Sequence, residues 1–249
     1  MIIAIANYKG GVGKTTTAIN VAYNLAAIHE KRVLMIDADS SRNLSIFFRT
    51  YDEKRAGLTE LLRGECSFHK AVKRSRYKNL DIIQSKKSLI DINEDDMDGL
   101  YDVLPEICER YDHCIIDCHP DFNHITKGVL AVCDHVIVPI KVDRNALNGL
   151  ELMQECLDEM NRYRAAMYEL DPLELKVLIT MYQNNKVTRS GIEELITKTN
   201  YPVFHSVIRN TCKCVESIEK KKPLMKCASK STACQDYDGL VYEILGGGL

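Results

Sequence analysis

The 249-residue sequence lacks the features that mark several classes of protein. Its ten cysteines form no Cys-x-x-Cys pair, and none has a histidine at zinc-finger spacing, so we expect reduced, mostly buried thiols. No uncharged apolar run approaches the roughly 18 residues that a membrane span needs. The apolar N-terminus has no basic segment before it and is cut short by Lys9, which excludes a signal peptide. These absences predict a cytoplasmic protein.

A strong net charge, a linker and an internal repeat are also missing. The 33 lysines and arginines nearly balance 35 aspartates and glutamates, for a formal net charge of −2, so any nucleic-acid role must come from a local basic patch. The composition, 45% hydrophobic and 27% charged, is typical of globular proteins and excludes a disordered tail or a small disulfide scaffold. Without a Pro/Ser-rich linker, we expect residues 1–249 to form a single domain.

Short apolar runs alternate with longer mixed segments, which is the pattern of βαβ units. The apolar runs lack period-two alternation, as is expected of parallel strands covered by helices on both faces. The predicted strands are 2–6, 33–36, 80–83, 114–116, 135–140 and 175–180. The predicted helices are 15–27, 58–62, 97–110, 146–162 and 190–197. The sequence therefore predicts an α/β fold, a doubly wound and mostly parallel sheet with helices on both faces.

A glycine-rich segment joins the first predicted strand to the first predicted helix. Residues 9–17 read Lys-Gly-Gly-Val-Gly-Lys-Thr-Thr-Thr, and Tyr8 stands where the general phosphate-loop pattern has its first glycine. The glycines let backbone N–H groups turn inward around a phosphate, and the helix N-terminus adds partial positive charge. Lys14 supplies a cation for the β- and γ-phosphates, and the Thr15 hydroxyl is placed to bind Mg²⁺. The predicted nucleotide-binding residues are Lys9, Gly10, Gly11, Val12, Gly13, Lys14, Thr15 and Thr16.

Carboxylates follow two of the predicted strands. Asp37 and Asp39 end the run 33–39, and Asp117 ends the run 114–117. The carboxyl ends of parallel strands face the ligand crevice of an open sheet, so these side chains are expected beside the phosphate loop. We expect Asp117 to hold Mg²⁺ through water, and Asp37 or Asp39 to touch the metal or orient the attacking water. The alternative for each aspartate alone is a helix N-cap.

These motifs resemble those of the ParA/MinD class of P-loop ATPases, which carry a deviant Walker A motif. Residues 9–16 match the signature K-G-G-x-G-K-[ST]-[ST], and residues 33–39 resemble V-L-L-I-D-x-D. Residues 111–120, Tyr-Asp-His-Cys-Ile-Ile-Asp-Cys-His-Pro, resemble Y-D-x-I-I-I-D-C-P-P. Residues 131–141 resemble A-A-D-x-V-I-V-P, residues 178–182 resemble L-x-T-M-Y, and residues 57–64 resemble G-L-x-E-x-L-x-G. The resemblance covers nearly the whole chain.

The resemblance implies a weak, partner-stimulated ATPase that uses ATP and Mg²⁺. It implies a homodimer formed face to face around two ATP molecules, DNA binding by that dimer, and release on hydrolysis. Lys9 is then the signature lysine that reaches the partner's nucleotide, Lys14 the phosphate-loop lysine and Asp117 the Walker B carboxylate. The implied catalytic residues are Lys9, Lys14 and Asp39, and the metal residues are Thr15, Asp37 and Asp117.

Within this class the sequence resembles the short, Soj-like partition ATPases. Its first predicted strand begins at residue 2, so we expect no N-terminal helix-turn-helix segment. The tail 242–249 has no lysine or arginine and breaks on glycines, unlike the basic amphipathic membrane helix of MinD relatives, so we expect no membrane partner. Cys118 alone matches a cysteine common in partition ATPases, without the paired cysteines of iron–sulfur relatives.

The sequence departs from the family pattern at three places. Residues 39–43 read Asp-Ser-Ser-Arg-Asn where the family has D-P-Q-G-N, so a switch segment loses a proline and a glycine. Residues 183–186 read Gln-Asn-Asn-Lys where relatives often have D-x-R-T. Near the C-terminus, Arg209 replaces a proline, and Asn210 and Lys213 replace arginines. The adenine contacts expected around residues 180–182 and 209–210 therefore stay open.

Charge is distributed unevenly along the chain. Residues 91–110 hold eight acidic residues and one basic, and residues 205–231 hold seven lysines and arginines against two glutamates. Either run alone is typical of a solvated face. The basic run overlaps the stretch where relatives place DNA-contacting residues, and non-specific binding needs little beyond cations near phosphates. The DNA-binding candidates are Lys186, Arg189, Lys213, Lys220, Lys221 and Lys222, and without a base-reading motif we expect non-specific binding of double-stranded DNA.

Three functions remain open from the sequence. The first is a nucleoid-associated ATPase that partitions a plasmid or chromosome with a ParB-like adaptor protein. The second is a ParA-like ATPase that positions a non-DNA cargo, and the third is a metabolic or metal-loading enzyme on the same fold. DNA retention that depends on the dimer would separate the first two from the third.

Overall fold

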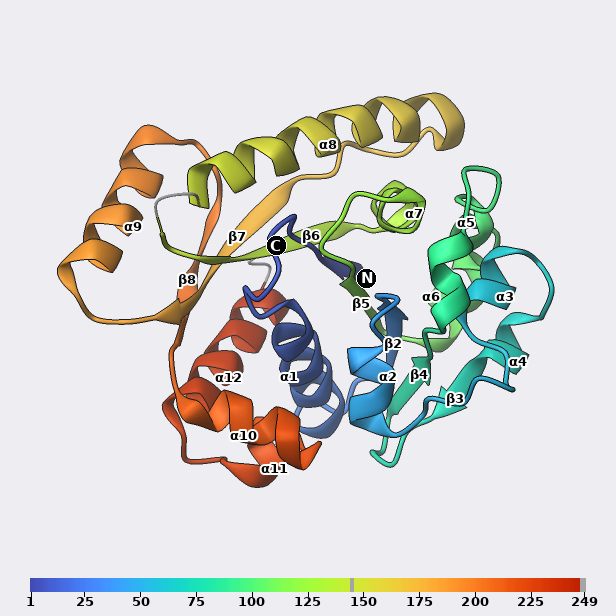
Figure 1. The fold of residues 1–249 in the computed structure, drawn as a ribbon, viewed down its shortest axis with the longest axis horizontal. Coiled ribbons are helices and arrows are strands. Elements are labelled where there is room, and N and C mark those ends of the chain that lie inside the picture. Colours follow the sequence, from blue (N-terminus) through green and yellow to red (C-terminus); the bar gives the residue numbers. More distant parts are fainter. Residues whose placement is uncertain (144–145, 247–249) are drawn as a thin grey trace.

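The computed structural model describes residues 1–143 and 146–246, which contain one eight-stranded sheet (Figure 1). The strand order is β3-β4-β2-β5-β1-β6-β7-β8. β3 is antiparallel to β4, and the other neighbouring pairs are parallel. The strands are β1 (Ile2–Ile5), β2 (Val33–Ala38), β3 (Val72–Arg74), β4 (Leu80–Ile83), β5 (His113–Cys118), β6 (His135–Lys141), β7 (Leu175–Tyr182) and β8 (Val203–Arg209). The predicted mostly parallel α/β sheet is confirmed.

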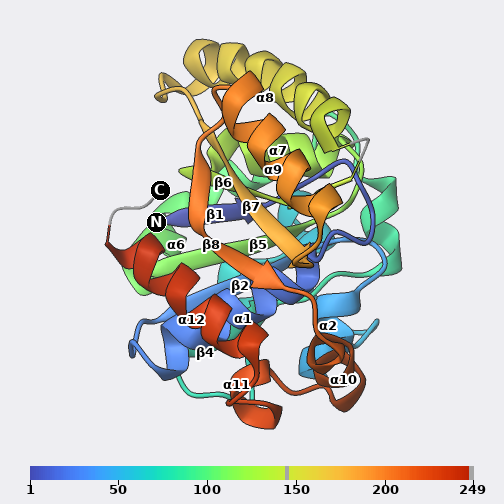
Figure 2. The same ribbon diagram turned by 90° about the vertical axis from the view of Figure 1, so that its left-hand side faces the viewer.

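Helices cover both faces of this sheet (Figures 1 and 2). One face carries α1 (Lys14–Ala27), α2 (Asn43–Phe48), α11 (Leu224–Cys227) and α12 (Thr232–Leu245), with α10 (Cys212–Lys220) beside α11. The other face carries α3 (Leu58–Leu62), α4 (Phe68–Ala71), a 3-10 helix (Lys87–Asp91), α5 (Gly99–Asp102), α6 (Leu104–Arg110), α7 (His124–Val132), α8 (Ala146–Tyr168) and α9 (Lys186–Lys198). Because both faces are covered, the central strands are apolar on both sides.

The six predicted strands are present, with ends that differ by at most two residues. The sequence missed the two edge strands β3 and β8, because β3 has only three residues and β8 mixes polar with apolar ones. The predicted helix 97–110 is wrong as one element. It is divided into α5 and α6, because Pro105 in the first turn of α6 cannot donate the N–H that a continuous helix requires. α8 runs six residues further than predicted and α9 begins four residues earlier.

The edge strand β8 is attached to α12 through backbone hydrogen bonds. The N–H groups of His205 and Ser206 donate to the two carboxylate oxygens of Glu243, at 3.0 and 3.1 Å. The N–H of Arg209 donates to Asp236 at 2.9 Å, and the Arg209 guanidinium pairs with the same carboxylate. α12 therefore fixes the outer side of β8 as well as covering the sheet beside α1.

The structure also tests what was predicted about the cysteines and about membrane-spanning segments. All ten cysteines are free thiols, but only five of them are buried, so the expectation of mostly buried thiols holds for half of them. Within residues 1–143 and 146–246, no helix combines the length and apolar character needed to cross a membrane. The last three residues of the tail, 247–249, lie outside the described residues.

Candidate functional site

The phosphate loop forms a concave backbone at the carboxyl end of β1. Gly11 and Gly13 have φ angles of +73° and +93°, in the left-handed region that favours glycine. A Cβ atom at Gly10, Gly11 or Gly13 would meet no other atom within 4 Å, so a ligand can approach the loop backbone directly. α1 begins at Lys14, and the N–H groups of a first helical turn have no partner within their own helix. The loop thus fits a phosphate.

A pocket of about 430 Å³ lies over this loop. It is lined by Gly10, Gly11, Gly13, Lys14, Thr15, Thr16, Asp39, Ser41, Asn43, His119, Pro120 and Met181. Six of the eight predicted nucleotide-binding residues are therefore brought together. Val12 is buried beside the pocket, where its carbonyl accepts the Thr180 hydroxyl at 2.8 Å, and Lys9 is not among the lining residues.

Lys14 is held in place by backbone carbonyls. Its Nζ donates to the carbonyl oxygens of Asn7 and Lys9, both at 3.1 Å, and the side chain is buried. Burial lowers the pKa of Lys14, and the nearby carboxylate of Asp117 opposes that change. A buried cation with two neutral acceptors is poorly compensated, so binding an anion at the loop would supply the charge that Lys14 lacks.

Lys9 lies outside the pocket, on the rim of the loop. Its Nζ pairs with Asp143, which follows β6, and its side chain is 42% exposed. Its backbone N–H donates to the side chain of Asn7 at 2.9 Å, which fixes where the loop leaves β1. The Lys9 ammonium is thus paired outside the pocket, although the Lys9 carbonyl accepts the Lys14 side chain beside the loop.

Asp117 is a buried carboxylate with unused oxygens. It lies opposite Asp37 in the β2–β5 register, and it is 1% exposed. Neither Asp117 oxygen has a partner at ordinary hydrogen-bond distance, although the Thr15 side chain lies close enough to act on the carboxylate. Burial raises the pKa of Asp117 well above its usual range, the negative charge of Asp37 adds to this, and Thr15 and Lys14 oppose it. Oxygen ligands beside a threonine hydroxyl and a phosphate cradle fit Mg²⁺, which commonly takes one or two carboxylates plus phosphate oxygens.

The oxygens of Asp37, by contrast, already accept hydrogen bonds, two of them from Ser45 of α2. One of its oxygens accepts the Ser45 N–H at 2.8 Å and the Ser45 hydroxyl at 2.6 Å, and the other accepts the Asp39 N–H at 3.3 Å. Burial raises the pKa of Asp37 to about 7, against the lowering effect of the Ser45 hydrogen bonds. Of the two paired carboxylates, Asp117 is therefore the better placed to reach a metal, and Asp37 holds α2 against β2.

Asp39 is the acidic residue that lines the pocket. Its Oδ1 accepts the Ser41 N–H at 2.7 Å and lies 3.8 Å from Nε2 of His119, which follows the end of β5. His119, Ser41 and Asn43 were not predicted as site residues. Their position directly after strands that end in aspartate is the signal that could have found them.

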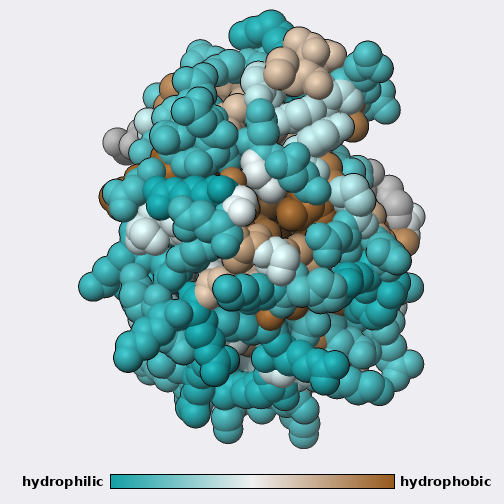
Figure 3. Space-filling model, turned by 90° about the vertical axis from the view of Figure 1, so that its right-hand side faces the viewer, coloured by the Kyte–Doolittle hydropathy of each residue, from teal (hydrophilic) through white to brown (hydrophobic). Residues whose placement is uncertain are grey.

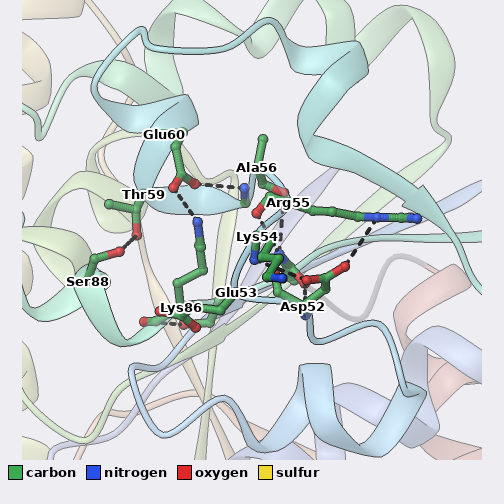
Figure 4. Close-up of polar contacts among 12 residues, drawn as sticks. Asp52, Glu53, Lys54, Arg55, Ala56, Thr59, Glu60, Lys86 and Ser88 are labelled. Carbon is green, nitrogen blue, oxygen red and sulfur yellow. Dashed lines mark hydrogen bonds and ion pairs between the residues drawn. The ribbon is translucent and has the colours of Figure 1, made fainter.

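A polar network continues behind the carboxylates. The Ser45 hydroxyl, which donates to Asp37, also accepts the N–H of Ser85 at the end of β4 (2.9 Å). The next residue, Lys86, pairs with Glu60 of α3, whose second oxygen accepts the Gly57 N–H at 2.9 Å (Figure 4). α2, β4 and α3 are thereby joined by hydrogen bonds on the far side of Asp37.

The same network holds the surface loop 52–56. The side chain of Gln84 accepts the Asp52 N–H at 2.8 Å and donates to the Asp52 carbonyl at 2.8 Å and the Arg55 carbonyl at 3.0 Å. Figure 4 shows this loop beside Lys86 and Glu60. One buried amide therefore satisfies the backbone of a loop that has no regular structure of its own.

The predicted DNA-binding residues do not form one cluster. Lys186 and Arg189 lie on α9, on one face of the sheet, whereas Lys213 and Lys220 lie on α10, beside the other face (Figure 2). Lys213 and Lys220 both pair with Glu216, at 2.7 and 3.1 Å. The candidates Lys221 and Lys222 follow α10, and Lys221 accepts a hydrogen bond from Arg76 through its carbonyl.

Two other surface features lie away from the phosphate loop. A larger pocket of about 830 Å³ lies between α8, α9 and the amino end of β7, the edge of the sheet opposite to the ligand crevice. The side of the molecule that carries α3 to α6 is mostly hydrophilic (Figure 3), as expected if the acidic run 91–110 is a solvated face. Within the described residues, no group of three or more His, Cys, Asp or Glu side chains forms a separate metal site.

A parallel sheet whose first strand leads through a glycine-rich loop into a helix, with a buried acid on the neighbouring strand, defines a P-loop nucleotide-binding protein. The AAA domain family matches residues 1–169. The chain is 32% identical over 258 residues to the chromosome partitioning protein ParA of Caulobacter vibrioides, across 98% of this chain and 93% of that protein. The chain therefore belongs to the ParA family of P-loop ATPases, and the resemblance noted from its motifs is confirmed.

Solved structures show the same fold. A plasmid partition protein from Borrelia burgdorferi has a TM-score of 0.78 and 23% identity, covering 99% of this chain and 98% of its own. A variant of McdA from Cyanothece in complex with ATP has a TM-score of 0.85 and 22% identity, covering 98% and 96%. At these identities the likeness establishes the fold and leaves the cargo open.

Proposed function

We propose that residues 1–249 act as one ATPase domain, which dimerises with ATP, binds DNA without sequence preference and partitions a plasmid or chromosome with a ParB-like adaptor. The observation that supports this most directly is the buried Asp117, whose two oxygens lack partners beside an open phosphate cradle. The ParA relative of Caulobacter vibrioides favours partition over other uses of the fold. The McdA structure, which carries ATP, keeps a cargo-positioning ATPase as the second candidate.

In this proposal each residue has a separate task at the pocket. The loop backbone and Lys14 would hold the phosphates, and Thr15 and Asp117 would hold Mg²⁺, which would neutralise phosphate charge. Asp39 also lines the pocket and would accept a hydrogen bond from the attacking water, whose attack on the γ-phosphate gives ADP and inorganic phosphate. Asp37 contributes by fixing α2.

Lys9 supplies the link between ATP binding and the dimer. Because it lies outside its own cradle, we propose that it leaves Asp143 and reaches the phosphates of the partner subunit. A cation there would offset the repulsion between two bound nucleotides. Lys9→Ala should therefore retain ATP binding and lose both the ATP-dependent dimer and hydrolysis. Normal dimerisation and turnover in that variant would contradict the proposed dimer.

The function is tested by DNA binding of the ATP-bound protein. Wild type and Asp39→Ala are compared by size-exclusion chromatography and by filter binding to two unrelated double-stranded DNAs at several salt concentrations. Asp39→Ala is expected to bind ATP, hydrolyse it poorly and persist as a dimer. Six phosphate contacts per dimer would give a log–log salt slope of roughly −5, equal on both DNAs.

The outcomes separate the candidate functions. DNA binding that requires ATP and falls steeply with salt supports a partition or positioning ATPase on nucleoid DNA. If ATP produces a dimer that binds no DNA at low salt, the basic segment is a solvated face and a cargo that uses another surface is favoured. If neither a dimer nor DNA binding appears while ATP is hydrolysed, the metabolic alternative gains support.

A further inference from the structure

His119 is a polar side chain at a position where the family pattern has proline. Residues 117–120 read Asp-Cys-His-Pro, and the pattern that they resemble reads D-C-P-P. A proline side chain has no hydrogen-bond donor or acceptor, whereas an imidazole offers one of each. This chain therefore places hydrogen-bonding capacity on the wall of the nucleotide pocket where its relatives' pattern has none.

The imidazole of His119 lies beside the carboxylate of Asp39. Nε2 of His119 lies 3.8 Å from Oδ1 of Asp39, and both residues line the pocket over the phosphate loop. The other ring nitrogen, Nδ1, is buried without a partner. A hydrogen on Nε2 is the arrangement that lets the ring donate toward the carboxylate, and it leaves no unsatisfied N–H in the interior.

The two oxygens of Asp39 are not equivalent. Oδ1 accepts the Ser41 N–H at 2.7 Å and faces His119, whereas no described residue donates to Oδ2. The Ser41 hydrogen bond holds Oδ1, and a second donor on the same oxygen would further restrict rotation of the carboxylate about its Cβ–Cγ bond. With both donors in place, Oδ2 would remain available for the water that Asp39 is proposed to orient.

We propose that His119 is a positioning residue for Asp39. When the site closes on ATP, its Nε2–H donates to Oδ1 of Asp39 and holds Oδ2 toward the attacking water. The 3.8 Å separation is too long for a hydrogen bond, and such contacts often tighten only in the substrate complex. This inference rests on the proposed ATPase function and deepens it.

The test measures steady-state hydrolysis of Mg-ATP by the full chain for wild type, His119→Ala, His119→Pro and His119→Gln. We expect Ala and Pro to lower kcat about tenfold with an unchanged KM, the size expected for one hydrogen bond to a charged group. Gln keeps an N–H donor at similar reach and should restore kcat to within about threefold of wild type. The matched control is His124→Ala, an exposed histidine at the start of α7, which should behave as wild type.

A double variant distinguishes positioning from a general structural effect. In the Asp39→Ala background, His119→Ala should cost no further activity, because its partner is already gone. Equal losses in both backgrounds, a rise in KM without a change in kcat, or failure of Gln to restore activity would each overturn the proposal. If wild type hydrolyses no ATP, the proposed function itself fails. If wild type hydrolyses ATP and the His119 variants have the same kcat as wild type, only the proposed role of His119 is refuted.

Discussion

The phosphate loop and the basic run 205–231 both contain lysines that are predicted to bind phosphates, but the two are built differently. Lys14 is buried, and two backbone carbonyls fix its ammonium at the base of the loop. Lys213 and Lys220 are surface residues that share one carboxylate, Glu216. The backbone sets the position of the first cation, whereas a neighbouring acid sets the effective charge of the other two. Counting charges along the sequence is therefore informative for the loop and misleading for α10, which carries two glutamates as well as two lysines.

The largest expected effect is at the loop. ATP with Mg²⁺ at about a hundred times its Kd should stabilise wild type by about 2.7 kcal/mol, which raises Tm by roughly 5–10 °C for a chain of this size. Lys14→Ala should abolish this shift, because the buried cation is lost. Thermal melting with and without Mg-ATP measures it, and Lys54→Ala, on the exposed loop 52–56, is the control. An undiminished shift in Lys14→Ala would contradict the assigned site.

DNA binding by the basic run 205–231 should depend on Glu216 as well as on the lysines of that run. Replacing Lys213, Lys220 and Lys222 with Ala should weaken DNA binding by the ATP dimer about tenfold or more at low salt and flatten the salt slope. Glu216→Gln should do the opposite, because it releases two lysines from their shared partner. Filter binding across a salt series compares the two variants. If Glu216→Gln leaves the slope unchanged, α10 does not face the DNA.

A smaller effect is expected at the unpartnered carboxylate. Asp117→Asn removes a buried ionisable group whose pKa burial raises well above its usual range, so the nucleotide-free protein should gain about 1 kcal/mol, or roughly 2–4 °C in Tm. The same change should remove the part of the ATP-dependent shift that requires Mg²⁺. Melting curves with ATP, in Mg²⁺ and in EDTA, separate the two effects. A less stable apo variant would indicate that Asp117 has a structural role.

The smallest effect is expected at the end of α10. Lys221 caps this helix with a φ of +52°, a conformation that costs a side chain more than it costs glycine. Lys221→Gly should raise stability by about 0.5–1 kcal/mol, although it removes a positive charge. Lys220→Gly, one residue earlier and inside the helix, should lower it by a similar amount. Chemical denaturation of the two variants gives the comparison directly.

The sequence predicted those parts of the fold and the site that depend on a pattern within one short segment. The apolar strands and the glycine-rich loop carry their own pattern, so most of the sheet and seven of the lining residues, Asp39 among them, could be predicted. The contacts that decide chemistry are between segments far apart. Nothing in the sequence shows that Ser45 donates hydrogen bonds to Asp37, or that His119 lies beside Asp39. α12 was missed as well, because its buried side chains meet α1, more than 200 residues away.

The attachment of β8 to α12 limits how this chain can aggregate. An edge strand normally exposes free N–H groups that can pair with a strand of another molecule. Here Glu243 and Asp236 already accept three of those groups from β8. The opposite edge, β3, is three residues long and carries Lys73 and Arg74, both of which discourage pairing. The sheet is therefore poorly suited to grow by strand addition, and ordered self-association is left to the loops and helices that surround it.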